Sequence, residues 1–254
     1  MVTTTWTHGV IIDDAAPNNH TCDEGSGYLD GETLHVSLKG GTGQSLTLIN
    51  KRRLEQMTQG SEVLVVEPKK THEVQFVSVN DGQLVKGRKL QFQHNCNGIA
   101  HNLQDLYLTS STALYKYSMS GDLLRKLYED KSGGSTVNKC AVSSSGDKIH
   151  VLVTNLSHSK VLTLDRDGTV LHTFTDPGLK YQAGIHMTAL GQVLVCGRLS
   201  STVLQLDGEG KKKLATLATR SDGVDGPWSV CYNRNTASII VGQTGSSILV
   251  FKVK

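Results

Sequence analysis

Several features that would assign this 254-residue chain to a class at once are missing from its sequence. The five cysteines are odd in number and include no Cys-x-x-Cys pair, which argues against a disulfide framework and against a zinc finger. Only 4 residues are proline and 37% are hydrophobic, so the chain is neither collagen-like nor disordered. The net charge of +3 is too small to require a nucleic-acid partner.

Long apolar runs are also missing. No stretch approaches the roughly 18 residues of a membrane span. The first residues, MVTTTWTHGVII, have no basic start and no apolar core, so no secretory signal is predicted. We therefore expect a soluble cytoplasmic protein without a membrane partner, whose cysteines are reduced and mostly packed in the core.

A repeat is present in the second half of the chain. Segments that begin at Asn97, Lys139, Ala183 and Trp228 align, and the equivalent positions Gly98, Cys140, Gly184 and Ser229 are 42, 44 and 45 residues apart. A glycine before the last strand of each unit recurs at Gly82, Gly121, Gly168 and Gly210. A period in the forties, with four short strands in each unit, is typical of a β-propeller blade.

The unit that begins at Asn97 shows how each copy divides into strands. GIAHN reads as the inner strand, DLYLTS as the second, TALYKYS as the third and LLRKLYE as the outermost, with a glycine hairpin before the last. A single four-stranded sheet cannot bury both of its faces alone. Leu106, Leu108, Leu114 and Tyr115 are therefore expected to fill the space between neighbouring blades.

The chain length divided by this period gives just under six blades. The last unit ends at its third strand, SILVFKVK, and the segment Val2–Ile12 reads as a strand without a unit of its own. We predict that this segment supplies the missing outer strand and closes the ring. The predicted fold is a single all-β domain, a six-bladed β-propeller of four-stranded antiparallel blades closed by pairing of its N- and C-terminal strands. The blades are expected near residues 13–60, 61–96, 97–138, 139–182, 183–227, and 228–254 plus 1–12.

The units resemble degenerate NHL repeats. The matching segments are Gly98-Ile99-Ala100, Leu106-Tyr107-Leu108, Ile239-Ile240-Val241 and Ile248-Leu249-Val250-Phe251. As a whole the chain is similar to the C-terminal propeller of invertebrate tripartite-motif (TRIM) and B-box proteins, especially the bivalve sets. NHL repeats often carry an Asp just after the second strand, where this chain has Ser110, Asn155, Gly197 and Gln243. A ligand mode tied to that Asp is therefore not carried over.

The resemblance implies a recognition module that binds a protein substrate or RNA. In such proteins a RING domain supplies ubiquitin-ligase activity, and this chain has no Cys/His spacing for one. The propeller itself is thus expected to be non-enzymatic and monomeric.

Several motifs in the sequence resemble chemical sites, but each also fits a structural role. Asp165-Arg166-Asp167-Gly168 lacks the later ligands of a calcium loop and falls where a hairpin turn is expected. Lys39–Ser45 precedes no helix, so an inter-strand loop is favoured over a phosphate-binding loop. Cys96, Cys140 and Cys231 have no recurring His or Asp partner, so core packing is favoured over nucleophilic chemistry. No catalytic residue, metal or cofactor is predicted, and a metal-dependent hydrolase or lyase with a site in the central channel stays an alternative.

Binding residues are expected on one face of the ring. In a propeller, the loops between the second and third strands and between blades open on one face, here called the first face, and the remaining turns open on the second face. Lys51–Arg53 and Lys211–Lys213 fall on the second face. The candidate binding residues, all on or beside first-face loops, are Lys69, Lys70, His72, Lys180, Tyr181, Arg198, Arg220 and Trp228.

Two kinds of ligand fit these residues. Tyr181 and Trp228 lie beside cations and can anchor a peptide or stack on bases, so a protein partner is expected and RNA is the alternative. A structural role for Trp228, capping an inner strand and packing between blades, also fits the sequence.

Overall fold

The computed structural model describes two parts of the chain. Within the first 71 residues it describes the backbone of the strands alone. Beyond them it describes residues 72–80, 83–102, 104–132, 134–143, 145–154, 159–188, 190–233, 237–244 and 248–252. The predictions for Lys39–Ser45, Lys51–Arg53, Lys69, Lys70 and Gly82 lie outside these residues.

The described chain is all-β, and its strand pairings are antiparallel. A seven-stranded sheet, in the order β4-β3-β2-β1-β5-β6-β7, contains β1 (Thr4–Ile11), β2 (His20–Asp30), β3 (Thr33–Leu38), β4 (Leu46–Asn50), β5 (Glu62–Val66), β6 (Glu73–Asn80) and β7 (Gln83–Gln91). The first four-stranded sheet contains β8 (Gly98–His101), β9 (Asp105–Thr109), β10 (Ala113–Ser118) and β11 (Leu123–Glu129).

Two more four-stranded sheets and one three-stranded sheet follow. The second comprises β12 (Val137–Val142), β13 (Lys148–Thr154), β14 (Ser159–Asp165) and β15 (Val170–Phe174). The third comprises β16 (Gln182–Met187), β17 (Val193–Gly197), β18 (Thr202–Leu206) and β19 (Lys213–Ala218). The last comprises β20 (Pro227–Asn233), β21 (Ser238–Gln243) and β22 (Ile248–Lys252).

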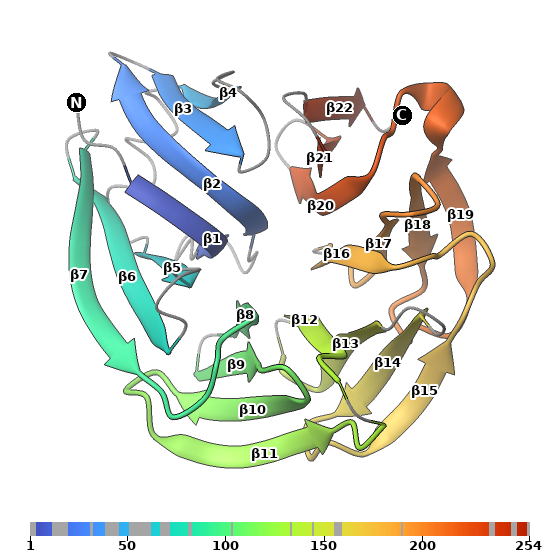
Figure 1. Cartoon of the computed structure of the whole chain (residues 1–254), viewed down its shortest axis with the longest axis horizontal. Coiled ribbons are helices and arrows are strands. Elements are labelled where there is room, and N and C mark those ends of the chain that lie inside the picture. The colour runs from blue at the N-terminus through green and yellow to red at the C-terminus, as the bar shows by residue number, and fades with distance from the viewer. Residues whose placement is uncertain are drawn as a thin grey trace.

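These sheets are arranged around a common centre, with β8, β12, β16 and β20 innermost and β11, β15 and β19 outermost (Figure 1). This is the arrangement of a β-propeller, and the prediction of four-stranded antiparallel sheets is confirmed for the three sheets from β8 to β19. A short 3-10 helix, η1 (Arg220–Asp222), lies between β19 and β20. Within the described ranges, no helix is long and apolar enough to cross a membrane.

Strand alternation explains how each sheet buries both of its faces. In β9, Leu106 and Leu108 pack into a cluster with Phe76 of the preceding sheet, whereas Tyr107 points the other way and packs with Val151 of the following sheet. Successive side chains of a strand point to opposite faces, so an uninterrupted apolar run suits a strand between two neighbours. The predicted inter-blade residues fit this pattern, since Leu106, Leu108 and Leu114 are fully buried and Tyr115 is partly buried.

The recurring turn glycines allow close contact between a sheet and the one before it. Gly168, between β14 and β15, has a φ of +90°, and a Cβ placed there would lie 2.1 Å from the carbonyl oxygen of Leu127 in β11. Gly210, between β18 and β19, has a φ of +62°, and its Cβ would lie 2.3 Å from Oγ1 of Thr163 in β14. Both the positive φ and the close approach require glycine, which explains why this position repeats.

The predicted closure by pairing of the N- and C-terminal strands is not confirmed. β1 lies inside the seven-stranded sheet, where His8 is paired both with Asp23 of β2 and with Val66 of β5. A strand has only two edges, and over His8–Ile11 both edges of β1 are paired, with β2 and β5 rather than with β22. The strands predicted for the first two blades share this sheet with β1. In the described part of the chain, β22 pairs only with β21.

Candidate binding surface

Three loops of the first face converge between the third four-stranded sheet and its neighbours. Two backbone hydrogen bonds join the first pair of loops: the Arg198 N–H donates to the Tyr181 carbonyl (3.1 Å), and the Leu199 N–H donates to the Lys180 carbonyl (3.0 Å). The Lys180 N–H in turn donates to Oγ of Ser200 (3.2 Å). The loop before β16 and the loop between β17 and β18 therefore form one rigid unit.

Ser201 attaches the third loop to this unit. Its side chain is buried, with 1% exposed, and its Oγ accepts hydrogen bonds from Nη2 of Arg220 (3.0 Å) and from the Gly226 N–H (3.2 Å). Arg220 also forms an ion pair with Asp225 (3.1 Å). The loop between β19 and β20 is thereby fixed beside Arg198 and Leu199.

An Arg–Trp pair lies at the point where the loops meet. The Arg198 guanidinium carbon is 3.8 Å from the centre of the Trp228 ring, within the range of a cation–π contact. Trp228 belongs to β20, yet 39% of it is exposed. Its ring is therefore available on the first face as well as packed against Arg198.

Backbone strain is concentrated in the same place. Tyr181 and Ser201 both have a φ of +51°, and Ala237 is the third non-glycine residue with positive φ in the described chain. A bulky residue in this region costs about 1–3 kcal/mol and persists only where the surrounding structure enforces it, often at binding sites. We name this surface the cationic rim; it consists of Lys180, Tyr181, Arg198, Leu199, Arg220 and Trp228.

The cationic rim combines charge with an apolar side chain. Leu199 is 65% exposed, and no carboxylate pairs with Lys180 or Arg198 among the described residues. A surface of this composition can hold a carboxylate or phosphate beside an apolar group. Sequence reasoning missed Leu199, although its position directly after Arg198 in a first-face loop was a usable signal.

The structure brings Lys180, Tyr181, Arg198, Arg220 and Trp228 together, as their loop positions predicted. His72 is elsewhere. It precedes β6 in the seven-stranded sheet, where its carbonyl accepts a hydrogen bond from the Phe92 N–H (2.7 Å).

The residues with which metal or nucleophilic chemistry was considered can be placed in the described part of the chain. That part contains no group of three or more His, Cys, Asp or Glu side chains that could hold a metal ion. Cys96, Cys140, Cys196 and Cys231 are buried thiols outside any disulfide, as expected for core packing. Burial raises the pKa of the Cys96 and Cys140 thiols to about 12, so both are protonated near neutral pH and are poor nucleophiles.

The predicted hairpin turn at Asp165–Gly168 is confirmed. Oδ1 of Asp165 accepts hydrogen bonds from the N–H groups of Asp167 (2.9 Å) and Thr169 (2.8 Å), and the Gly168 N–H donates to the Asp165 carbonyl (3.1 Å). The Asp167 carboxylate pairs with Arg125 (2.8 Å). Both carboxylates are thus used within the turn and its contact with β11.

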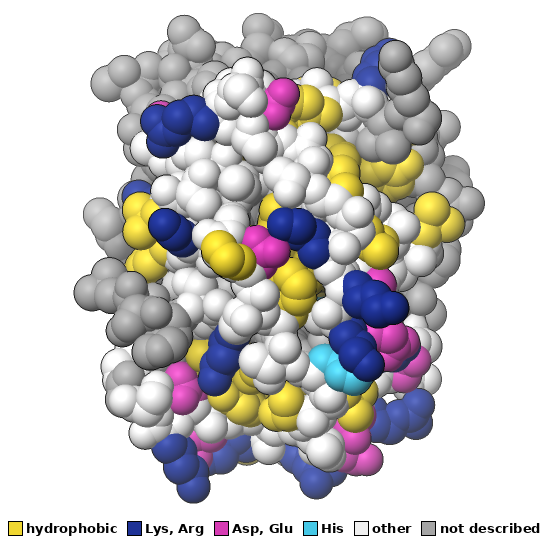
Figure 2. All heavy atoms as spheres, turned by 90° about the vertical axis from the view of Figure 1, so that its right-hand side faces the viewer, with side chains coloured by type: hydrophobic (Ala, Val, Ile, Leu, Met, Phe, Trp, Pro, Cys, Tyr) yellow, Lys and Arg dark blue, Asp and Glu magenta, His cyan; other side chains and the backbone are white. Residues whose placement is uncertain are grey.

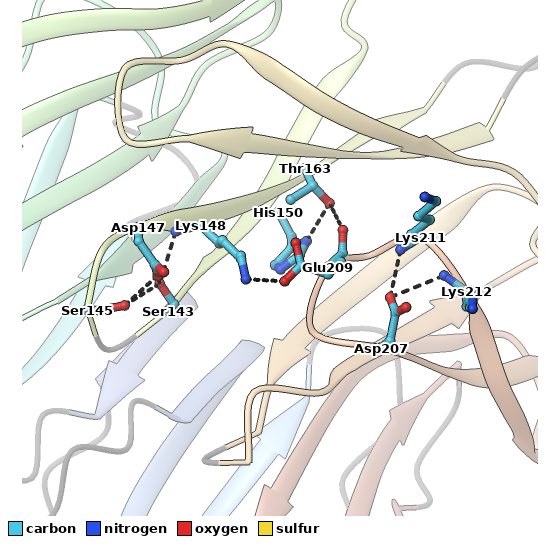
Figure 3. Close-up of polar contacts among 10 residues, drawn as sticks. All are labelled: Ser143, Ser145, Asp147, Lys148, His150, Thr163, Asp207, Glu209, Lys211 and Lys212. Carbon is cyan, nitrogen blue, oxygen red and sulfur yellow. Dashed lines mark hydrogen bonds and ion pairs between the residues drawn. The ribbon is translucent and has the colours of Figure 1, made fainter.

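On the second face, hydrogen bonds and ion pairs connect neighbouring sheets. The turn between β18 and β19 lies against β13 and β14 (Figure 3). Thr163 Oγ1 donates to the Glu209 carbonyl (3.0 Å), so the remaining bond, between Thr163 and His150 (3.0 Å), has Nδ1–H of His150 as its donor. Lys148 forms an ion pair with Glu209. Burial lowers the pKa of His150 to about 4, and its ring is neutral.

The lysines of the second face contribute to the same turn. The N–H groups of Lys211 and Lys212 donate to Oδ1 of Asp207, at 2.8 and 3.2 Å (Figure 3), and the Lys213 ammonium pairs with Asp176 at 3.0 Å. On the side of the ring that carries β15 and β19, basic, acidic and hydrophobic side chains are interspersed (Figure 2). That side therefore shows no patch of a single charge sign.

Comparison with known proteins agrees with this architecture. No family model matches the chain, and no curated protein matches it. Solved structures do match, at 12 to 16% identity, which shows the fold alone. The chain is thus a β-propeller by fold class.

Three similar structures illustrate the likeness. A chain from the crystal structure of a nidogen/laminin complex superposes with a TM-score of 0.57 at 14% identity, covering 99% of this chain and 94% of that one. A functionally unknown protein from Desulfotomaculum acetoxidans gives 0.59 at 12% identity, covering 98% of this chain and 76% of that one. A protein of unknown function from Bacteroides caccae gives 0.50 at 16% identity over 70% of this chain; this chain spans 64%, less than two thirds, of that protein.

Proposed function

We propose that this propeller is a non-enzymatic recognition module that binds a protein partner at the cationic rim. The observation that carries the proposal is the exposed Arg198–Trp228 pair, fixed where three loops meet. Tryptophan and arginine are enriched among the residues that dominate binding energy at protein interfaces. Loops held by a rigid scaffold are also where binding residues concentrate. A propeller of similar fold in a nidogen/laminin complex is consistent with a role in protein binding.

The finer part of the proposal rests on the resemblance to NHL repeats. In this proposal residues 1–254 form one six-bladed NHL-like propeller, which serves as the recognition part of a cytoplasmic TRIM-like ubiquitin ligase. The ligase activity would then belong to a RING domain outside this chain.

RNA remains the competing ligand, and two observations favour protein over it. One face of the Trp228 ring is covered by Arg198, which leaves less aromatic surface for a base. Lys211 and Lys212 are exposed on the opposite face, so the basic residues do not form one track for a phosphate backbone.

The experiment compares three immobilised proteins as bait for cell extract. They are the parent chain, a rim variant with Arg198→Ala and Trp228→Ala, and a matched second-face variant with Lys211→Ala and Lys212→Ala. Captured proteins are quantified by mass spectrometry, with and without nuclease, and circular dichroism checks that each bait is folded. We expect a partner that the parent and second-face baits retain, that the rim bait loses, and that nuclease does not release. Equal capture by the rim bait, or loss with nuclease, would overturn the proposal.

A further inference from the structure

The chemistry of the cationic rim identifies the class of partner, an inference that rests on the function proposed above. We propose that the rim selects an acidic peptide segment that carries a bulky apolar side chain. In this arrangement the Arg198 guanidinium binds a carboxylate of the partner while it remains stacked on Trp228, and the apolar side chain covers Leu199.

The Arg198 side chain is held in a position from which it can bind a carboxylate. Its guanidinium carbon lies over the Trp228 ring at 3.8 Å, and in the described ranges its side-chain N–H groups make no hydrogen bond or ion pair. Those N–H groups form a fork that matches the two oxygens of a carboxylate. Because the ring and the loop already hold the side chain, less conformational entropy is lost when the partner binds.

The surroundings of Arg198 contain more cations than available carboxylates. Lys180 is exposed beside the Arg198 loop, since its carbonyl accepts the Leu199 N–H (3.0 Å). Lys180 has no ion-pair partner in the described ranges, whereas cations such as Arg125 and Lys213 on other parts of the surface do.

The carboxylates closest in sequence to the rim already have partners. Asp225 pairs with Arg220 (3.1 Å), and Asp176 pairs with Lys213 (3.0 Å). Asp222 accepts the Thr219 N–H (2.9 Å) at the start of η1. Within the rim, Lys180 and Arg198 are therefore the cations without a paired carboxylate in the described ranges, and complementary charge is what selects partners and speeds their association.

Leu199 supplies the apolar half of the site. Its N–H is bonded to the Lys180 carbonyl, so the backbone holds the residue in the loop while 65% of it faces solvent. An exposed leucine fixed beside an aromatic ring and unpaired cations fits a ligand with both an apolar and an acidic group. A purely polar phosphate chain would leave this leucine uncovered.

The test is a fluorescence anisotropy titration with synthetic probes. The main probe is a short peptide with adjacent leucines flanked on both sides by glutamates. Matched peptides replace the glutamates by glutamine or the leucines by glycine, and a single-stranded RNA oligonucleotide is the fourth probe. We expect the acidic leucine peptide to bind the parent chain, with an affinity that falls as salt rises, and each matched peptide to bind about ten-fold more weakly or worse.

Variants locate the binding on the rim. Arg198→Ala is expected to weaken the acidic leucine peptide about ten-fold or more. Arg198→Lys keeps the charge but loses the planar fork, so it should weaken binding nearly as much. Lys211→Ala on the second face should leave the affinity unchanged. Thermal melts check that each variant is folded. If a variant unfolds, the comparison of the matched peptides on the parent chain still tests the proposal.

The outcomes separate this inference from the function on which it rests. If the acidic leucine peptide binds no better than its glutamine counterpart, while the captured partner still depends on the rim, the inference is wrong and the proposed function stands. If the RNA probe binds more tightly than the acidic leucine peptide and loses affinity with Arg198→Ala, both are wrong. If no captured partner depends on the rim, the proposed function itself falls.

Discussion

The guanidinium of Arg198 and the indole of Trp228 join two neighbouring sheets at the first face. Arg198 follows β17, and Trp228 lies in β20, with 3.8 Å between the guanidinium carbon and the ring centre. The contact thus links the third four-stranded sheet to the last sheet. It has a structural value as well as the proposed role in binding, and the two can be separated.

Trp228→Ala is expected to lower the free energy of unfolding only modestly, by about 0.5–1 kcal/mol for a cation–π contact at an exposed position. Urea titration followed by circular dichroism measures this change. Trp228→Phe, which keeps an aromatic ring, is the control and should lose less. A loss comparable to that of a core truncation, about 3–5 kcal/mol, would show that Trp228 is mainly a packing residue.

Gly168→Ala should be markedly more destabilising than Gly134→Ala. Both glycines have a φ of +90°, but a Cβ at Gly168 would lie 2.1 Å from the Leu127 carbonyl oxygen, whereas at Gly134 nothing lies within 4 Å. The shared backbone strain is worth roughly 1–2 kcal/mol. The clash should add at least about 1 kcal/mol at Gly168 alone. Equal midpoints of denaturant unfolding for the two variants would contradict the observed docking of this turn on β11.

His150 should make the protein less stable in mild acid. Burial lowers its pKa in the folded state from the ordinary 6.5 to about 4, and the nearby Lys148 acts in the same direction, while Glu209 and Asp207 oppose it. Between these two values the unfolded chain binds the extra proton, so stability is highest above 6.5 and falls as the pH drops toward 4. The full shift corresponds to roughly 3 kcal/mol.

Unfolding free energies measured across that pH range check the effect. His150→Gln removes the titrating group and should flatten the pH dependence. Thr163→Val is the control, because it removes the hydrogen bond (3.0 Å) but keeps the imidazole, so it should lower stability while the slope persists. A parent protein whose stability is independent of pH between 6.5 and 4 would refute this role.

Val250→Lys should reduce self-association of the chain. β22 pairs only with β21 among the described strands, and Val250 is 59% exposed. Unpaired edges with apolar side chains template pairing with other chains, and lysine is a common way to block it. Sedimentation velocity over a range of concentrations measures the change. Leu190→Lys, at an 82% exposed leucine in a turn, is the matched control. If both variants behave alike, general surface hydrophobicity rather than the edge is responsible.

The repeated part of the fold was predictable because its signals are local. Apolar alternation and turn glycines recur from Asn97 onward, and both depend on short stretches of chain. The pairing of β1 was not predictable, because alternation identifies a strand without saying which edges it will meet. β1 pairs with the 11-residue β2 on one edge and, over His8–Ile11, with the Val63-Leu64-Val65-Val66 run of β5 on the other.

In the cationic rim, too, features set by the order of the loops were predictable, whereas side-chain contacts between distant residues were not. The positions of Lys180, Tyr181, Arg198, Arg220 and Trp228 follow from loop order in a ring, so their convergence was predictable. Leu199 was missed because a single leucine in a loop belongs to no periodic pattern. The stacking of Arg198 on Trp228 depends on how two side chains are oriented across a sheet boundary, which no spacing rule contains.

The turn glycines described above contact the sheet that precedes their own in the chain, so these contacts between sheets all run the same way round the ring. The described turns between third and fourth strands reach back to the preceding sheet, as Gly168 does to Leu127 and Gly210 to Thr163, so a sheet is secured by the element that follows it in the chain. A change in such a turn disturbs two sheets, and no larger residue fits there without moving the backbone. First-face loops carry no such constraint at Leu199, whose side chain points to solvent. A change at Leu199 would therefore leave the glycine-dependent contacts between sheets unaltered, and if the rim binds a partner as proposed, this position can alter specificity without affecting those contacts.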